Sequence, residues 1–198
     1  RFVIGYVGTH GMAHGLANVL DAAALLKGRP DIVFLFVGAG AEREALIENA
    51  RSRELENTIF IPPQPKDLMP AVWSLCDVAL IHLRNAEAFK DVIPSKMFEA
   101  MGMGLPILLA LPEGEASGIL TFSGAGLHVP PADPHALANA VCWLAENTQD
   151  CERMAARSLA SAPSYSRETQ AAHMARVLEA VVDGAGGLIA EISVSEID

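Results

Sequence analysis

Runs of apolar residues, each about the length of one buried strand, alternate along the chain with segments of helical periodicity. The runs occupy residues 2–7, 32–37, 58–61, 77–83, 106–111 and 126–129. After the first run, Leu16, Leu20 and Ala23 recur at a spacing that places them on one face of a helix. Continuous apolar runs are typical of strands that a parallel sheet buries on both faces. The pattern therefore predicts an α/β fold, a doubly wound and mainly parallel sheet of about six strands flanked by helices.

Capping signals predict where several helices begin. Asp133 precedes Pro134, and proline suits the first helical position while an aspartate caps free N–H groups. Asp67 is expected to cap a helix that runs to about residue 75, with Pro70 in its tolerated first turn. Ser95 is expected to cap another helix that ends near residue 103.

Composition limits the classes of protein that remain. The chain has 198 residues, of which 51% are hydrophobic and 19% charged, and its formal net charge is −10. A chain of this length buries roughly 70% of its unfolded surface, which excludes disorder as the main state. The negative charge argues against nucleic acid as a partner, because phosphate binding needs clustered Lys and Arg. Every apolar run is far shorter than the roughly 20 residues of a membrane span.

No composition shift divides the chain, so we expect one domain over residues 1–183 and then a Gly-rich linker with an acidic tail at 184–198. The chain opens on a strand-like run without a Met, so we expect a preceding segment. The three cysteines match neither a CxxC nor a zinc pattern, which favours packed thiols in a reducing compartment. His10 and His14 lie four apart with no third ligand adjoining, so no metal site is expected.

Candidate binding residues lie in the loops that follow the strands, where open α/β sheets bind ligands. These loops are residues 8–15, 38–40, 62–65, 84–94 and 112–114. They spell neither GxGxxG nor a Walker loop, and GxSxG and HExxH are also absent from the chain. In the first loop, glycines allow backbone N–H groups to approach an anion, and His10 or His14 can add a donor. The same glycines also suit a tight turn without a ligand.

Residues 91–102 carry the most informative pattern. Asp91 lies in a connection, Ser95 begins a helix, and Glu99 follows one turn later. Two carboxylates with free N–H groups between them suit a sugar nucleotide, whose hydroxyls bind carboxylates and whose diphosphate binds N–H groups. Lys96 adds positive charge. Alternatively, Asp91 is solvated and Glu99 is an ordinary helix residue.

The segment Pro-Ser-Lys-Met-Phe-Glu-Ala-Met-Gly-Met-Gly-Leu-Pro-Ile at 94–107 resembles the signature of the retaining glycosyltransferases of family 4. Residues 8–15, 36–46 and 77–80 resemble that family's glycine loop, its VGxGxxxxxL run and its ADV strand, in the same order. The family has the GT-B fold of two Rossmann-like domains, and the resemblance covers the donor-binding C-terminal one. The form of these motifs in this chain, Gly-Thr-His-Gly at 8–11 and Ile-Pro-Ser-Lys at 93–96, is similar to that in enzymes of bacterial O-antigen, colanic acid and capsule assembly, including transferases of acetylated amino sugars.

The resemblance implies a role for each matching position. Asp91 and Glu99 correspond to the catalytic carboxylate pair, with Glu99 on the ribose hydroxyls and Asp91 near the donor sugar. The implied nucleotide-binding set is Gly8, Thr9, Gly11, His14, Gly38, Pro63, Gln64, Pro94, Ser95, Lys96 and Glu99. Thr9 and His14 stand where the family often has Arg and Lys, so the positive charge for the diphosphate must come from Lys96, Lys90 or Arg84, or from helix N-termini.

The expected function is the donor-binding half of a transferase that moves a sugar, with retention, from a UDP-sugar such as a UDP-N-acetyl sugar to a glycan or lipid-linked acceptor. Neither a cofactor nor a metal is expected, because backbone dipoles and basic side chains stabilise the leaving diphosphate. An N-terminal acceptor-binding domain is the expected partner, in the cytoplasm and at the inner face of the membrane. Two alternatives stay open, half of a UDP-sugar 2-epimerase and a non-enzymatic α/β interaction module.

Overall fold

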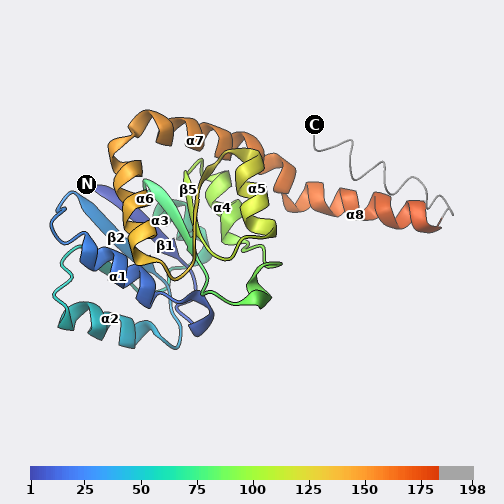
Figure 1. Cartoon of the computed structure of the whole chain (residues 1–198). Coiled ribbons are helices and arrows are strands. Elements are labelled where there is room, and N and C mark those ends of the chain that lie inside the picture. Colours follow the sequence, from blue (N-terminus) through green and yellow to red (C-terminus); the bar gives the residue numbers. More distant parts are fainter. Residues whose placement is uncertain (183–198) are drawn as a thin grey trace. The chain divides into compact units, whose positions relative to one another are not determined.

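The computed structural model describes residues 1–182 and contains one sheet of six parallel strands (Figure 1). The strands are β1 (Phe2–Val7), β2 (Ile32–Val37), β3 (Thr58–Ile61), β4 (Val78–His82), β5 (Ile107–Ala110) and β6 (Gly126–Val129). Their order across the sheet is β3-β2-β1-β4-β5-β6, and every neighbouring pair is parallel. The predicted doubly wound α/β fold is therefore confirmed.

Five helices connect successive strands, and three more follow β6 in the described residues. They are α1 (Ala17–Leu25), α2 (Arg43–Ser52), α3 (Met69–Trp73), α4 (Lys96–Gly102), α5 (Glu115–Ser123), α6 (Pro134–Glu146), α7 (Thr148–Ser161) and α8 (Arg167–Val182). Short 3-10 turns occupy Met12–His14, Lys66–Leu68, Glu87–Phe89 and Ala162–Tyr165. The connections after β1 and after β4 therefore each contain one such turn at the edge of the sheet where the strands end.

One of the three capping predictions is confirmed in full. Asp133 caps α6, since its Oδ1 accepts the Ala136 N–H at 2.9 Å. Asp67 does not cap a helix, because the Met69 N–H already donates to the Lys66 carbonyl and Pro70 has no N–H to donate. Ser95 precedes α4 as predicted, but its own backbone is already helical (φ −57°, ψ −30°), and its hydroxyl makes no capping bond.

Alternating side chains of the strands form two buried faces. Even-numbered residues of β1, β2, β4 and β5 pack with α1, α2 and α6 in one core cluster, and Tyr6, Phe34 and Phe36 are among its larger members. Helix α4 buries Met97 and Met101 and packs on β4, β5 and α7. Because the sheet is covered on both faces, only the strand ends and their loops are left to carry a ligand site.

The chain separates into two compact units, Arg1–Ser161 and a second that begins at Ala162. The predicted linker and tail at 184–198 lie outside the described residues, and the domain boundary at 183 stays a prediction. Cys76, Cys142 and Cys151 are free. No helix within residues 1–182 has both the length and the apolar character needed to cross a membrane.

Candidate functional site

The strand order reverses direction between β1 and β4, which are neighbours at the centre of the sheet. From β1 the chain proceeds outward to β2 and β3, whereas from β4 it proceeds the other way to β5 and β6. At such a switch point the loops after the two central strands diverge and leave room for a ligand. The loops that follow β1 and β4, residues 8–16 and 83–95, are therefore the structural candidates for a site.

The loop after β1 is held against the loop after β2 by backbone contacts. The His10 N–H donates to the Ala39 carbonyl at 2.8 Å. Gly38 (φ +148°) faces the same loop so closely that a Cβ on it would lie 1.9 Å from the Gly8 carbonyl oxygen. Gly40 (φ +155°) is equally restricted by the His10 carbonyl oxygen, at 2.3 Å. Gly38 and Gly40 therefore permit the close backbone approach that joins the two loops.

The loop after β1 is also held against β4. The Arg84 N–H donates to the Ala13 carbonyl at 3.0 Å. His82, at the end of β4 and 1% exposed, lies with Nδ1 2.6 Å from the His14 carbonyl and with Nε2 2.9 Å from the Asn18 amide nitrogen. Because an amide nitrogen only donates, Nε2 is the acceptor and Nδ1 carries the proton that His82 donates to His14. His82 therefore joins the strand to the loop.

Lys96 extends from the first position of α4 to the end of β1. Its Nζ lies 3.0 Å from the Tyr6 hydroxyl oxygen and 4.2 Å from the centre of the Tyr6 ring. A Cβ on Gly8 would lie 2.9 Å from the same nitrogen, so the absence of a side chain there makes room for the ammonium. The structure thus brings together three predicted positions, Gly8, Thr9 and Lys96, because the Tyr6 hydroxyl also donates to the Thr9 carbonyl at 2.7 Å.

Burial shifts the pKa values of Lys96 and of the two histidines in the loop after β1. It lowers the pKa of Lys96 to about 8, against the opposing effect of the Glu99 carboxylate. It also lowers the pKa of His14 to about 4, with further contributions from Lys96, His82 and His10. His10 has no exposed surface, and burial, Arg43 and Lys96 lower its pKa to about 4 as well. At neutral pH the histidines of this loop are therefore neutral, and Lys96 is the cation among them.

The other candidate cations already have partners. Lys90 Nζ lies 2.8 Å from the Glu87 carboxylate, and the Arg84 guanidinium lies over the Phe89 ring at 6.0 Å. The connection that carries them is tied to the start of α5, because the Lys90 carbonyl accepts the Glu115 N–H at 3.1 Å. Of the three cations that the sequence offered, Lys96 is the one whose charged nitrogen lies at the glycine loop, whereas Arg84 approaches Gly15 of that loop through its Cβ.

The remaining predicted residues lie at the surface around this edge. Glu99 is exposed on α4 and close enough to Lys96 to affect its pKa, whereas Asp91 is exposed in the connection before α4. Pro94 is partly buried and Ser95 exposed. Pro63 and Gln64 follow β3, at the outer edge of the sheet and two strands from β1, where Gln64 Nε2 donates to the Pro62 carbonyl at 3.0 Å. Gly11, which begins the 3-10 turn after β1, is partly exposed.

Two residues of this site, Tyr6 and His82, are not among the positions singled out from the sequence. Both occupy the last or next-to-last position of an apolar strand, and each is the polar member of its run. A polar side chain at the carboxyl end of a central strand is the signal that points to them.

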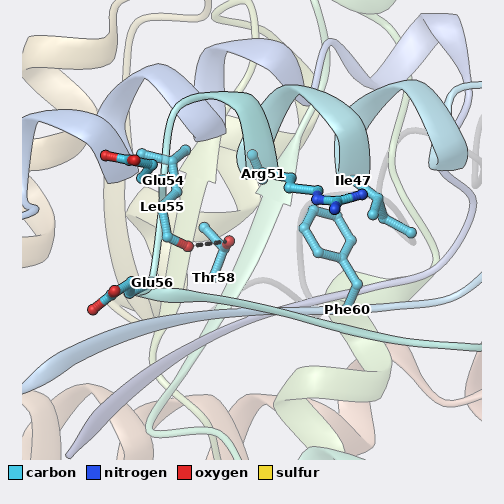
Figure 2. A pocket seen from close by; sticks show the side chains of 8 residues that line it. Ile47, Arg51, Glu54, Leu55, Glu56, Thr58 and Phe60 are labelled. Atoms are coloured by element: carbon cyan, nitrogen blue, oxygen red, sulfur yellow. Dashed lines mark hydrogen bonds between the residues drawn. The ribbon is translucent and has the colours of Figure 1, made fainter.

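A surface hollow of about 410 Å³ lies elsewhere, between α2 and β3 (Figure 2). Figure 2 shows the Arg51 side chain, from the helix, reaching to the Phe60 ring, from the strand. Its lining consists of Ile47, Ala50, Arg51, Glu54, Leu55, Glu56, Thr58 and Phe60. None of the predicted site residues lines this hollow, so the candidate site is defined by the contacts at the switch point. Within residues 1–182 no three His, Cys, Asp or Glu side chains are grouped to hold a metal ion.

Known proteins resemble the chain in sequence. WcaI of Escherichia coli K12, named as a colanic acid biosynthesis glycosyl transferase, is 32% identical over 137 residues, which are 68% of this chain and 33% of WcaI. WbjE of Pseudomonas aeruginosa, named as a glycosyltransferase, is 30% identical over 145 residues, or 73% of this chain and 36% of WbjE. The chain thus spans about a third of the length of these curated relatives.

Solved structures resemble the chain in fold. Anabaena HepE in complex with UDP superposes with a TM-score of 0.79 at 22% identity, over 91% of this chain and 49% of HepE. The catalytic domain of the Helicobacter pylori cholesterol-α-glucosyltransferase gives a TM-score of 0.70 at 20% identity, over 83% of this chain and 99% of that one. These likenesses identify the fold as a Rossmann-like domain of the GT-B type. The sequence model described as Glycosyl transferases group 1 matches residues 1–159, and the chain therefore belongs to this family.

Proposed function

We propose that the chain is the donor-binding domain of a sugar-nucleotide-dependent glycosyltransferase of bacterial surface polysaccharide biosynthesis. The proposed donor is a UDP-sugar carrying an N-acetylated sugar, and the sugar passes with retention to a glycan or lipid-linked acceptor. The acceptor binds an N-terminal domain of the same longer protein, at the cytoplasmic face of the membrane. Support comes from the family, from the colanic acid assignment in the name of WcaI, and from the UDP complex of HepE.

The observation that carries the proposal is the Lys96 ammonium beneath the glycine loop at the switch point. The chain has a net charge of −10, so a dianionic diphosphate needs a local cation to approach it. We assign this role to Lys96, because Lys90 is paired with Glu87, the Arg84 guanidinium lies over the Phe89 ring, and the histidines are neutral. The Gly8 and His10 N–H groups already donate to the Val37 and Ala39 carbonyls, so backbone donors to the diphosphate come from the other N–H groups of this loop, which add no charge.

The proposed roles follow from this placement. Lys96 and the loop N–H groups stabilise the charge that develops on the leaving diphosphate, and the reaction requires no divalent metal. Glu99 accepts hydrogen bonds from the ribose hydroxyls, and Asp91 lies beside the donor sugar. The turn at 62–65 lies along the base and contributes its backbone groups. Since the acceptor site belongs to another domain, the isolated chain binds the donor and turns it over little.

Calorimetric titration with UDP, GDP and UDP-N-acetylglucosamine tests this function. We expect UDP to bind more tightly than GDP, and Glu99→Ala to weaken UDP about tenfold, the effect of losing one charged hydrogen bond. Glu48→Ala, on the exposed surface of α2, is the matched control and leaves UDP affinity unchanged. Failure of every nucleotide to bind at millimolar concentration refutes the proposal. A UDP-sugar 2-epimerase half also binds UDP, and only the products of the longer protein separate that alternative.

A further inference from the structure

Tyr6 is the polar side chain of the central strand β1, and it contacts the proposed donor cation. Its side chain is 1% exposed, and its hydroxyl donates its single proton to the Thr9 carbonyl at 2.7 Å. With that proton committed, the hydroxyl oxygen can act toward other groups only as an acceptor. The Lys96 ammonium, at 3.0 Å, is the donor that uses it.

The Tyr6 ring contributes a second contact to the same ammonium. Lys96 Nζ lies 4.2 Å from the ring centre, within the range of a cation–π interaction. The backbone of Gly8 lies on another side of the ammonium, so close that a Cβ on Gly8 would be 2.9 Å from Nζ. The ammonium is therefore bounded by the Tyr6 ring, the Tyr6 hydroxyl and the backbone of the loop, which restricts it to one place.

We propose that Tyr6 is a positioning residue that holds Lys96 charged and directly beneath the loop at Gly8 and Thr9, where it meets the donor diphosphate. The inference rests on the proposed function and adds a residue that contacts neither the donor nor the reacting atoms. Tyr6 acts through Lys96, by supplying the oxygen and the ring face that replace water around a buried ammonium.

The titratable groups that influence Lys96 or respond to it come from four segments of the chain. They are Tyr6 on β1, His10 and His14 in the following loop, His82 on β4, and Glu99 on α4. Burial lowers the pKa of each of these histidines to about 4 and raises that of Tyr6. Lys96, with a pKa of about 8, is therefore the member of the group that changes charge between about pH 7 and 9.

Replacing Tyr6 by phenylalanine separates the two contacts. The ring and the packing remain, but the acceptor is lost, so the protonated form of Lys96 becomes less stable relative to the neutral amine. A charge-assisted hydrogen bond of the usual strength corresponds to a downward shift of about one pH unit in the Lys96 titration midpoint. The restricted position is lost too, so we expect UDP to bind about five- to tenfold more weakly at pH 7.5.

The test is a ¹⁵N titration of the lysine side-chain ammonium groups in the full 198-residue chain, together with UDP calorimetry across about pH 6.5 to 9.5. The chain has four lysines, and Lys96→Arg identifies the signal of interest. Tyr165→Phe changes the other tyrosine of the chain and is the matched control. We expect Tyr6→Phe, and not Tyr165→Phe, to lower the Lys96 titration midpoint. UDP affinity should fall as Lys96 loses its proton, so in Tyr6→Phe this fall should occur at a lower pH, shifted by as much as the midpoint.

The outcomes distinguish this inference from the proposed function. If wild type binds UDP and Tyr6→Phe has the same Lys96 midpoint and the same affinity, the positioning role is wrong while the function stands. If wild type binds no UDP, the function fails, whatever the midpoint does. Should Tyr6→Phe not fold, uniform incorporation of 3-fluorotyrosine weakens the acceptor without removing it. A Lys96 midpoint that does not fall in the fluorinated protein then overturns the inference.

Discussion

Lys96 should destabilise the folded chain at neutral pH. Its pKa is lowered from the ordinary lysine value of 10.5 to about 8 by burial, which corresponds to roughly 3 kcal/mol in favour of the neutral form. Since the side chain keeps some exposed surface, solvent screening reduces the expected cost to about 2 kcal/mol. Lys96→Met retains the apolar stem and removes the charge, so the variant should be about 2 kcal/mol more stable at pH 7.

The sign of the pH dependence follows from the same pKa. Between about pH 8 and 10.5 the unfolded chain binds more protons at Lys96 than the folded chain does, so the destabilisation that Lys96 causes declines with rising pH through this window. The advantage of Lys96→Met should therefore be full at pH 7 and absent above about pH 10.5.

Urea denaturation of both proteins at a series of pH values measures this difference. Lys27→Met, at an exposed lysine just after α1, is the control and should match wild type at every pH. UDP affinity should fall in Lys96→Met although stability rises, because the buried Lys96 charge lowers stability and is also the charge that binds the diphosphate. A Lys96→Met protein that is less stable than wild type at pH 7, or equally stable at all pH values, refutes the reasoning.

Three further predictions concern the loops of the site. Gly38→Ala should lower the free energy of unfolding by more than about 2 kcal/mol, because the new Cβ would lie 1.9 Å from the Gly8 carbonyl oxygen and the φ of Gly38 is +148°. Thermal denaturation measures this loss, and Gly102→Ala, whose Cβ would have nothing within 4 Å, is the control and should be nearly neutral. His82→Leu leaves the His14 carbonyl without its donor and should lower the free energy of unfolding by about 1–3 kcal/mol in urea denaturation. An unchanged free energy of unfolding would refute the role of His82 in holding the loop to β4. Buried histidines with pKa values near 4 bind fewer protons folded than unfolded, so stability should fall as pH drops from about 6.5 toward 4; His10→Phe should flatten that slope in denaturation curves, and an unchanged slope contradicts the assignment.

The fold could be predicted in detail because its signals are local. Strand runs and helical spacing are properties of neighbouring residues, so the predicted strands at 2–7, 32–37 and 58–61 match β1, β2 and β3 in both limits. Where the Asp67 cap failed, nearby residues explain the failure, since the Met69 N–H donates to the Lys66 carbonyl and Pro70 has no N–H.

The sequence by itself offered five loops at the strand ends and three cations as candidates for the site. It could not choose among Lys96, Lys90 and Arg84, because a side chain's charge and accessibility depend on what packs around it. Only the tertiary structure decided this, by pairing Lys90 with Glu87 and by burying Lys96 against Tyr6, 90 positions away in sequence. The hydrogen bond from His82 to the His14 carbonyl joins residues 68 positions apart and has no local sequence signature either. Contacts of this range exist only once the parallel sheet has placed the ends of β1 and β4 side by side.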